Sequence, residues 1–287
     1  MIHTLKNEHL TIEINSRGAE LTSVKSAGNH EFIWQGEAWR EHAPILFPVC
    51  GRLQDGKYKY RGKEYKMSSH GFAKYSEFTV SETGDNFITL TLTSSDETRE
   101  IYPFDFTLDA TYTLTENRLD AVFTVSNTGK HILPYMFGWH PGFTLSGDRE
   151  IGSFYVDFGN KKALSWHQLQ NGAFVNPFYS SYPLKGGRYY LNEEEIYSND
   201  TMIFKDTAHT VRLAGGYQRR SVTLAYSKNL PYMCIWKAPD STARFVCLEP
   251  WSDIPSDGET PENFDLRPMS RLSAGDKAEY SYSVVFE

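Results

Sequence analysis

The sequence is 287 residues long, 40% of them hydrophobic, and carries a formal net charge of −7. A chain of this size can bury a complete core without disulfides, metal or a partner, so residues 1–287 are expected to form a single domain. The negative charge balance argues against a nucleic acid partner, because phosphate backbones are bound by clustered Lys and Arg.

No segment of the sequence indicates a membrane span, a signal peptide or a disulfide framework. Apolar runs stay well short of the ~20 residues that a spanning helix requires, and the segment 1–6 lacks the charged and then apolar layout of a signal peptide. We therefore expect a soluble protein that stays in the cytoplasm, away from membranes. Cys50, Cys234 and Cys247 lie in apolar sequence without a C-x-x-C spacing, which predicts small buried side chains.

Alternating apolar and polar residues predict β-strands in most of the chain. The first is a hairpin, with strands over 10–14 and 19–24 and a turn at Ser16-Arg17-Gly18. The longest alternation runs over 104–114, and the short link that follows it predicts an antiparallel neighbour. Further strands are predicted over 88–92, 119–125, 221–226, 232–236, 244–248 and 280–286.

Helical periodicity is nearly absent from the sequence. The best candidate is a turn or two after Asn192, which can cap a helix whose first residues are the three glutamates 193–195. The stretch 253–267, rich in Pro, Asp, Glu and Asn, is predicted to be a long surface loop. Many short strands joined by regular turns predict an all-β fold of the sandwich or barrel type.

Glu249 is the most informative ionisable residue. In the apolar segment 245–251, period two places it on the same side as Phe245 and Cys247, at the end of a strand that Pro250 is expected to terminate. Burying a carboxylate is costly unless something uses or pairs it, so this position predicts a functional acid. The alternative is an ordinary strand-end glutamate turned to solvent.

Three further polar residues interrupt apolar or aromatic sequence. His140 lies in the aromatic segment 135–143, where one proline and two glycines predict a strand that runs into a tightly shaped loop. His70 precedes a glycine, and Arg52 ends the apolar run 44–51. The alternatives to a functional role are core histidines bonded to backbone carbonyls and a surface arginine at a strand end.

The motifs of several enzyme classes are missing. The histidines lack a close paired spacing such as H-x-x-x-H, so no metal is expected beyond what ligands gathered by the fold could hold. There is no glycine-rich loop for a nucleotide and no G-x-S-x-G of a serine hydrolase, so no cofactor is expected. Cys247 could imitate a cysteine nucleophile beside His140, but its apolar neighbours favour an inert thiol.

Taken in order, several short motifs resemble the aldose 1-epimerase (galactose mutarotase-like) family, and look most like its shorter bacterial LacX-like branch. The resemblance runs nearly end to end and rests on the joint order and spacing of the motifs rather than on any one of them. They are Arg17-Gly18-Ala19-Glu20-Leu21, Pro44-Ile45-Leu46-Phe47-Pro48 leading to Gly51-Arg52, His70-Gly71-Phe72, Tyr102-Pro103-Phe104, Gly138-Trp139-His140-Pro141-Gly142-Phe143 and Leu248-Glu249-Pro250-Trp251.

The resemblance implies a large antiparallel β-sandwich of the galactose mutarotase type, with a sugar cleft on one concave sheet. It implies an isomerase that interconverts the α and β anomers of an aldohexose without cofactor or metal. The family's acid histidine falls on His140 and its base glutamate on Glu249, while its substrate-binding arginine and second histidine fall on Arg52 and His70.

The sugar-binding aspartate of the family matches less clearly than these residues. We assign it to Asp200, in the segment 198–204, with Asp206 as the alternative. The Gly-Trp-His-Pro context of His140 also departs from the Asn-His-type context of the galactose mutarotases proper. This departure leaves the acid–base mechanism intact but does not point to galactose as the natural substrate.

Three other functions stay open at the level of the sequence. A noncatalytic carbohydrate-binding protein would keep the cleft without needing an acid and a base. A glycosidase would need a second carboxylate as a partner for Glu249. A mutarotase acting on hexose 6-phosphates would need several convergent cations, which the fold could gather from Arg52, Lys74, Arg99 and Arg271. We expect free aldohexoses as the substrate, because Arg52 alone provides too few cations to bind a phosphate.

Overall fold

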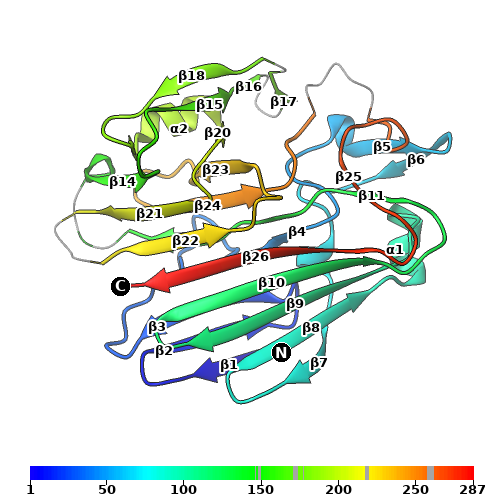
Figure 1. Cartoon of the computed structure of the whole chain (residues 1–287), viewed down its shortest axis with the longest axis horizontal. Helices are drawn as coiled ribbons and strands as arrows, with labels where there is room; N and C mark the ends of the chain where they lie inside the picture. The colour runs from blue at the N-terminus through cyan, green and yellow to red at the C-terminus, as the bar shows by residue number, and fades with distance from the viewer. Residues whose placement is uncertain (146, 148–149, 171–173, 177, 217–219, 257–261) are drawn as a thin grey trace.

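The computed structural model describes residues 1–145, 147, 150–170, 174–176, 178–216, 220–256 and 262–287. Within these residues the chain consists mainly of antiparallel strands, arranged as two large sheets with smaller sheets around them (Figure 1). The predicted all-β antiparallel sandwich is therefore confirmed. None of the helices in the described ranges is long and apolar enough to cross a membrane.

One large sheet has nine strands, every neighbouring pair of them antiparallel. Across the sheet they are β19 (Arg188–Tyr190), β14 (Phe154–Asp157), β21 (Thr210–Gly215), β22 (Val222–Tyr226), β26 (Lys277–Phe286), β10 (Arg118–Asn127), β9 (Phe106–Thr115), β8 (Phe87–Thr93) and β7 (Thr79–Thr83). In β9 and β10 every second side chain is buried, as the alternation in the sequence predicted. This sheet therefore has one face in the core and one face towards solvent.

The other large sheet has eight strands and carries the cavity described below. Along its main path they are β18 (Ser180–Pro183), β15 (Ala163–His167), β20 (Met202–Lys205), β23 (Tyr232–Trp236), β24 (Phe245–Trp251), β12 (Gly138–Trp139) and β4 (Ile45–Leu46), and β13 (Gly142–Thr144) also pairs with β24. Every residue of β24 is buried, unlike those of β9 and β10. A strand covered on both faces reads as a continuous apolar run, which makes a polar residue within it conspicuous.

Strand β24 continues past Pro250, which corrects the expectation that the proline ends it. Pro250 pairs with Met233 of β23, and the strand runs on to Trp251. On its other side β24 pairs with β13 at 245–247 and with β12 at Trp251, so Pro250 lies between these two pairings. Proline is tolerated there because its fixed φ fits an extended backbone, and because its missing N–H removes only one hydrogen bond from the ladder.

The smaller elements frame the two sheets. The predicted N-terminal hairpin is confirmed as β2 (Leu10–Asn15) and β3 (Glu20–Ser26), with β1 (Ile2–Lys6) beside β2. The remaining strand pairs are β5 (Lys57–Tyr60) with β6 (Lys63–Lys66), β11 (Leu133–Tyr135) with β25 (Ser270–Leu272), and β16 (Leu169–Gln170) with β17 (Phe174–Val175). The short 3-10 turns are η1 (Gln54–Gly56), η2 (Ala73–Tyr75) and η3 (Ile151–Ser153).

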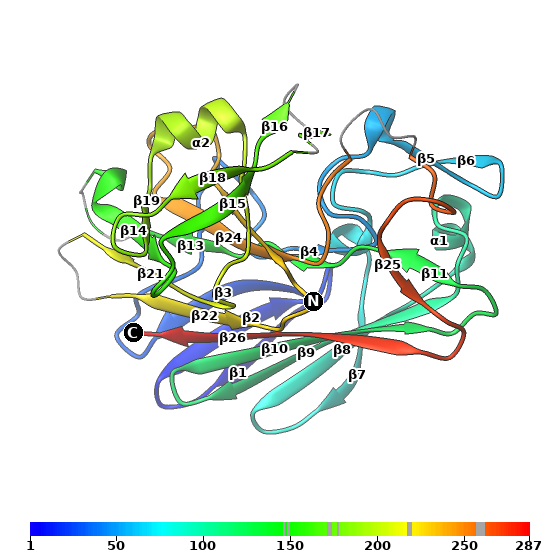
Figure 2. The same ribbon diagram turned by 45° about the horizontal axis from the view of Figure 1, so that its top comes forward.

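Two short helices complete the described chain. The helix predicted after Asn192 is α2 (Glu193–Asn199), and the side chain of Asn192 accepts a hydrogen bond from the backbone N–H of Glu195. The other, α1 (Asp96–Ile101), was not predicted, although Ser95 and Thr98 form a capping box at its start. In Figures 1 and 2, α2 and β26 lie on opposite sides of β24.

Aromatic side chains fill the space between the two large sheets. Phe137 stacks on Tyr280 with 4.5 Å between ring centroids, and Trp139 meets Tyr282 edge-on at 5.2 Å. Both tyrosines belong to β26, and Trp139 belongs to β12 of the other sheet. All three cysteines are free and buried, as predicted. The described parts of the predicted loop, 253–256 and 262–267, form neither helix nor extended strand.

Candidate active site

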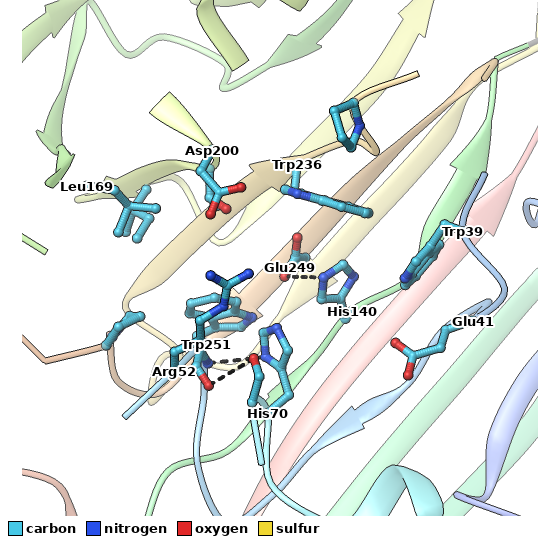
Figure 3. A pocket seen from close by; sticks show the side chains of 16 residues that line it. Trp39, Glu41, Arg52, His70, His140, Leu169, Asp200, Trp236, Glu249 and Trp251 are labelled. Atoms are coloured by element: carbon cyan, nitrogen blue, oxygen red, sulfur yellow. Dashed lines mark hydrogen bonds and ion pairs between the residues drawn. The ribbon is translucent and has the colours of Figure 1, made fainter. Parts of the chain in front are cut away.

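A cavity of about 390 Å³ opens on the eight-stranded sheet. Side chains of β23 and β24 line it from the sheet, and loops that are distant in sequence close its sides (Figure 3). Its lining includes Trp39, Glu41, Arg52, His70, His140, Asp200, Trp236, Glu249 and Trp251. The fold therefore brings together the five residues to which the family resemblance assigns roles, although they are spread over some two hundred positions of the sequence.

Glu249 reaches the cavity because β24 alternates its side chains between two layers. Val246 and Leu248 belong to the sandwich core, whereas Glu249 lines the cavity with a side chain that is 1% exposed. Burial raises the pKa of Glu249 well above its ordinary value, the carboxylate of Asp200 raises it further, and Trp251 partly offsets both. A carboxyl group in this position holds a proton more readily than one in water.

His140 faces Glu249 directly, with 3.0 Å between its Nε2 and Oε2 of the glutamate. Both the backbone and the ring of His140 are held in place. Its backbone N–H donates to the carbonyl of Pro44 at 3.1 Å, and its ring packs against the indoles of Trp39 and Trp236, at 5.0 and 5.6 Å between centroids. These contacts fix the orientation of the imidazole.

Burial shifts the pKa values of these two partners in opposite directions. It lowers the pKa of His140 well below its ordinary value, with a further contribution from His70, and it raises that of Glu249. Both shifts favour the uncharged forms, a neutral imidazole beside a carboxyl group that keeps its proton. Moving this proton from one partner to the other leaves the net charge of the cavity unchanged.

His70 presents a defined hydrogen-bond donor to the cavity. The backbone N–H of Gly51 donates to its Nδ1 at 3.1 Å, so the proton of the neutral ring lies on Nε2. Burial, together with the charges of Lys74 and Arg52, lowers the pKa of His70 to about 3. The ring is therefore neutral at physiological pH, and its Nε2–H can donate to a bound oxygen.

Because the pKa of His70 is low, we expect the wild type to lose more stability in acid than the variant His70→Asn. The ring has a pKa of about 3 in the folded protein, against an ordinary value of 6.5. Between these pH values the unfolded chain binds more protons than the folded one, so the free energy of unfolding falls as the pH drops from 6.5 towards 3. Urea unfolding at about pH 7 and about pH 5 should show a larger fall in the free energy of unfolding for the wild type than for His70→Asn. Equal falls in both proteins would contradict this assignment.

Arg52 and Asp200 reach the cavity from two loops. Asp200 directly follows α2 and caps its C-terminus, with φ 59° and ψ −55°. Burial raises its pKa, and the guanidinium of Arg52 partly offsets this. Asp206, the alternative candidate, does not line the cavity, and its exposed carboxylate accepts a hydrogen bond from Ser165 at 2.6 Å. Of the two aspartates, the geometry favours Asp200.

The cavity also contains residues to which the sequence assigned no role. Trp236 and Trp251 lie on β23 and β24 with the parity of Glu249, so the register of these strands could have indicated them. Glu41 lies in the irregular segment 36–44, which offers no periodic signal. Its two carboxylate oxygens lie 2.9 and 3.3 Å from the ammonium of Lys74, a lysine whose side chain is only 8% exposed.

One group of potential metal ligands occurs among the described residues. Ligand atoms of His140, Cys247 and Glu249 lie within 4.8 Å of one another. Cys247, however, is fully buried and does not line the cavity, and its sulfur lies 3.4 Å from the position that a Cβ on Gly142 would occupy. Of these three residues only the histidine and the glutamate line the cavity, so the group offers two ligands on that side, fewer than the three protein ligands of a catalytic zinc site.

Comparisons with known proteins place the whole chain in a family. The Aldose 1-epimerase family model matches residues 1–257. The plasmid-encoded protein LacX of Lactococcus lactis subsp. lactis is 28% identical, over 98% of this chain and 97% of that protein. A protein of Escherichia coli K12, whose name assigns it provisionally to glucose-6-phosphate 1-epimerases, is 33% identical over 81% of this chain and 76% of its own length.

Solved structures extend the similarity to the whole fold. A galactose mutarotase related enzyme from Lactobacillus acidophilus is 29% identical, with a TM-score of 0.93 over 100% of this chain and 97% of that one. A galactose mutarotase-like protein from Lactobacillus casei ATCC 334 is 28% identical, with a TM-score of 0.92 over 100% of both chains. The resemblance carried by the short motifs is confirmed along the molecule, and the chain belongs to the aldose 1-epimerase family.

Proposed function

We propose that this protein interconverts the α and β anomers of a free aldohexose, with His140 as general acid and Glu249 as general base. The observation that carries this proposal is the direct contact of 3.0 Å between Nε2 and Oε2 on the wall of a cavity of about 390 Å³. Burying an ionisable pair costs free energy, and sugar binding alone does not require it. Acid–base catalysis does require such a pair.

Ring opening of a pyranose needs an acid and a base side by side. The base removes the proton of the anomeric hydroxyl while the acid protonates the ring oxygen, and both oxygens are attached to the same carbon. A sugar hydroxyl that donates to Glu249 stabilises its carboxylate form, so the proton of the carboxyl group moves to His140. Glu249 then takes the hydroxyl proton as His140 gives its own to the ring oxygen, and the C1–O5 bond breaks.

Reclosure uses the same two groups in reversed roles. The open-chain aldehyde rotates about C1–C2 and presents its other face to the hydroxyl on C5. His140 removes the proton of that hydroxyl as the C1–O5 bond forms again, and Glu249 returns its proton to the former carbonyl oxygen. Both residues end the cycle in their starting states, which is what catalysis in either direction requires.

The other cavity residues are suited to holding the open-chain sugar until it recloses. His70 and Arg52 offer donors to sugar oxygens, and Asp200 offers an acceptor to sugar hydroxyls. The indoles of Trp236 and Trp251 offer faces for the C–H bonds of the ring. Keeping both ends of the intermediate in place raises the chance that it closes again in the same site.

The charges around the cavity support a neutral sugar over a hexose 6-phosphate. The described lining of the cavity contains the carboxyl groups of Glu41, Asp200 and Glu249, and Arg52 is its one Lys or Arg side chain. Lys74 approaches the site, but its ammonium is bound to Glu41. A phosphate needs several convergent cations, and the described lining of the cavity supplies one guanidinium.

The remaining cations considered for a phosphate are engaged elsewhere. Arg99 pairs with Asp96 at 2.8 Å and with Asp105 at 2.7 Å. Arg271 donates to three backbone carbonyls, among them that of Phe264 at 2.8 Å. Neither arginine lines the cavity, which favours the free aldose as substrate.

The test is a measurement of anomer exchange by NMR for glucose, galactose and glucose 6-phosphate at matched concentrations, with and without EDTA. We expect exchange of a free aldose well above the buffer rate, a higher kcat/KM than for glucose 6-phosphate, and no effect of EDTA. A higher kcat/KM for the phosphate would identify a hexose 6-phosphate mutarotase. Sugar binding with no effect on the exchange rate would identify a noncatalytic carbohydrate-binding protein.

A further inference from the structure

Lys237 is a buried lysine that the acid–base mechanism does not use. It directly follows β23, and its side chain is 0% exposed. Three acceptors surround its ammonium group: the carboxylate of Glu193 at 3.0 Å, the hydroxyl of Tyr197 at 2.7 Å and the carbonyl of Asp240 at 2.7 Å. An ammonium has three N–H donors, so each of them has a partner.

These acceptors belong to two segments beside the cavity. Glu193 and Tyr197 lie one turn apart on α2, and Asp240 lies in the loop that follows β23. Helix α2 ends at Asn199, and the next residue, Asp200, lines the cavity on the same side as Trp236, the last residue of β23 (Figure 3). The buried ammonium therefore connects the helix that leads into Asp200 with the strand end at the cavity.

The position of Asp200 depends on such support. Its φ of 59° with ψ of −55° is unfavourable for a residue other than glycine, and persists only where the surroundings hold it. A helix of seven residues is not stable in isolation, and Ile196 is the buried residue of α2. Contacts from the rest of the fold must therefore hold this helix, and Lys237 accounts for two of them.

We propose that Lys237 is a positioning residue for sugar binding: its ammonium, shared between α2 and the loop after β23, holds Asp200 where its carboxylate accepts hydrogen bonds from sugar hydroxyls. Lys237 itself does not line the cavity and does not touch the substrate. The inference rests on the proposed function, because it takes Asp200 as a ligand of the sugar.

Glu193→Gln tests this with a milder change than the loss of Lys237, because the glutamate side chain is 28% exposed whereas the lysine side chain is fully buried. It keeps the shape of the side chain and removes the charge that fixes the helix. We expect KM for the aldose to rise about tenfold, as for the loss of one good hydrogen bond, and kcat to stay within about twofold. Glu194→Gln, an exposed neighbour on the same helix, is the matched control and should leave both values unchanged.

A double-mutant cycle separates positioning from general loosening of the fold. In an Asp200→Asn background, Glu193→Gln should raise KM by no more than about twofold, because the group that it positions is already altered. A further tenfold rise in that background would overturn the proposal. So would a Glu193→Gln variant with the KM of the wild type, or one that loses kcat instead.

Direct binding keeps this test independent of turnover. Dissociation constants for glucose and galactose can be followed by the fluorescence of the tryptophans that line the cavity. If the wild type binds these sugars without accelerating anomer exchange, the proposed enzymatic function fails, whereas the same cycle on Kd still decides the role of Lys237. If the wild type binds neither sugar, both proposals are wrong.

Discussion

Glu249→Gln should lower kcat for anomer exchange by about 10²- to 10⁴-fold, the usual contribution of a positioned general base. Glutamine keeps the shape of the side chain, so the cavity stays filled, but its amide cannot take the proton of the anomeric hydroxyl. The free energy of unfolding should not fall, because the variant removes a carboxyl group whose pKa is raised by burial. Exchange by NMR and urea unfolding of the same samples measure both effects.

Two comparisons make this result specific. Glu37→Gln makes the same substitution at a surface glutamate whose side chain is 88% exposed, and should leave the rate unchanged. His140→Asn should lose a similar factor, and the double variant little more than either single one, because the two groups act as a unit. Near-normal turnover in a folded Glu249→Gln or His140→Asn variant would remove that residue from the mechanism.

Gly71→Ala should lower the free energy of unfolding by about 2–4 kcal/mol, the range for backbone strain combined with a steric conflict. Gly71 has a φ of +76°, and a Cβ on it would lie 2.0 Å from the carbonyl oxygen of Phe47. That oxygen also accepts hydrogen bonds from the N–H groups of Phe72 and Ala73. The segment must therefore move to admit the methyl group, and His70 moves with it.

Gly62→Ala is the matched control for this second result. Gly62 has a φ of +78°, close to that of Gly71, but a Cβ there would meet nothing within 4 Å. It should cost only the conformational penalty of about 1–2 kcal/mol. Urea unfolding of both variants separates the two contributions. If Gly71→Ala were no less stable than Gly62→Ala, the close approach to Phe47 would carry no energetic weight.

The strands were predictable to the extent that their pattern is local. Period-two burial is a property of consecutive residues, so β9 and β10 could be recognised from the sequence alone. Very short strands such as β12, with two residues, carry too little pattern to be recognised. The length of β24 depended on which strands pair beside Pro250, and sequence alone does not reveal partners that lie far along the chain.

The candidate site was predictable where a polar residue interrupts apolar sequence. Glu249 and His140 stand out for this reason, and their roles remain predictions for the variants above. Asp200 and Asp206 could not be separated, because both flank the same short strand, β20, and only the backbone around them decides which reaches the cavity. The burial of Lys237 gave no signal in the sequence, since its partners come from a helix some forty positions away.

The place of β26 in the larger sheet has a consequence for biosynthesis. This strand, residues 277–286, lies between β22 and β10 and pairs with both (Figure 1). Strands β7 to β10 leave the ribosome long before it, as do β14, β21 and β22. In the described part of the chain no strand of the first group pairs with a strand of the second, so the two halves of the sheet are joined only when β26 is inserted. Until then each half has an unpaired edge that can associate with other chains, which makes nascent chains of this fold natural clients of chaperones.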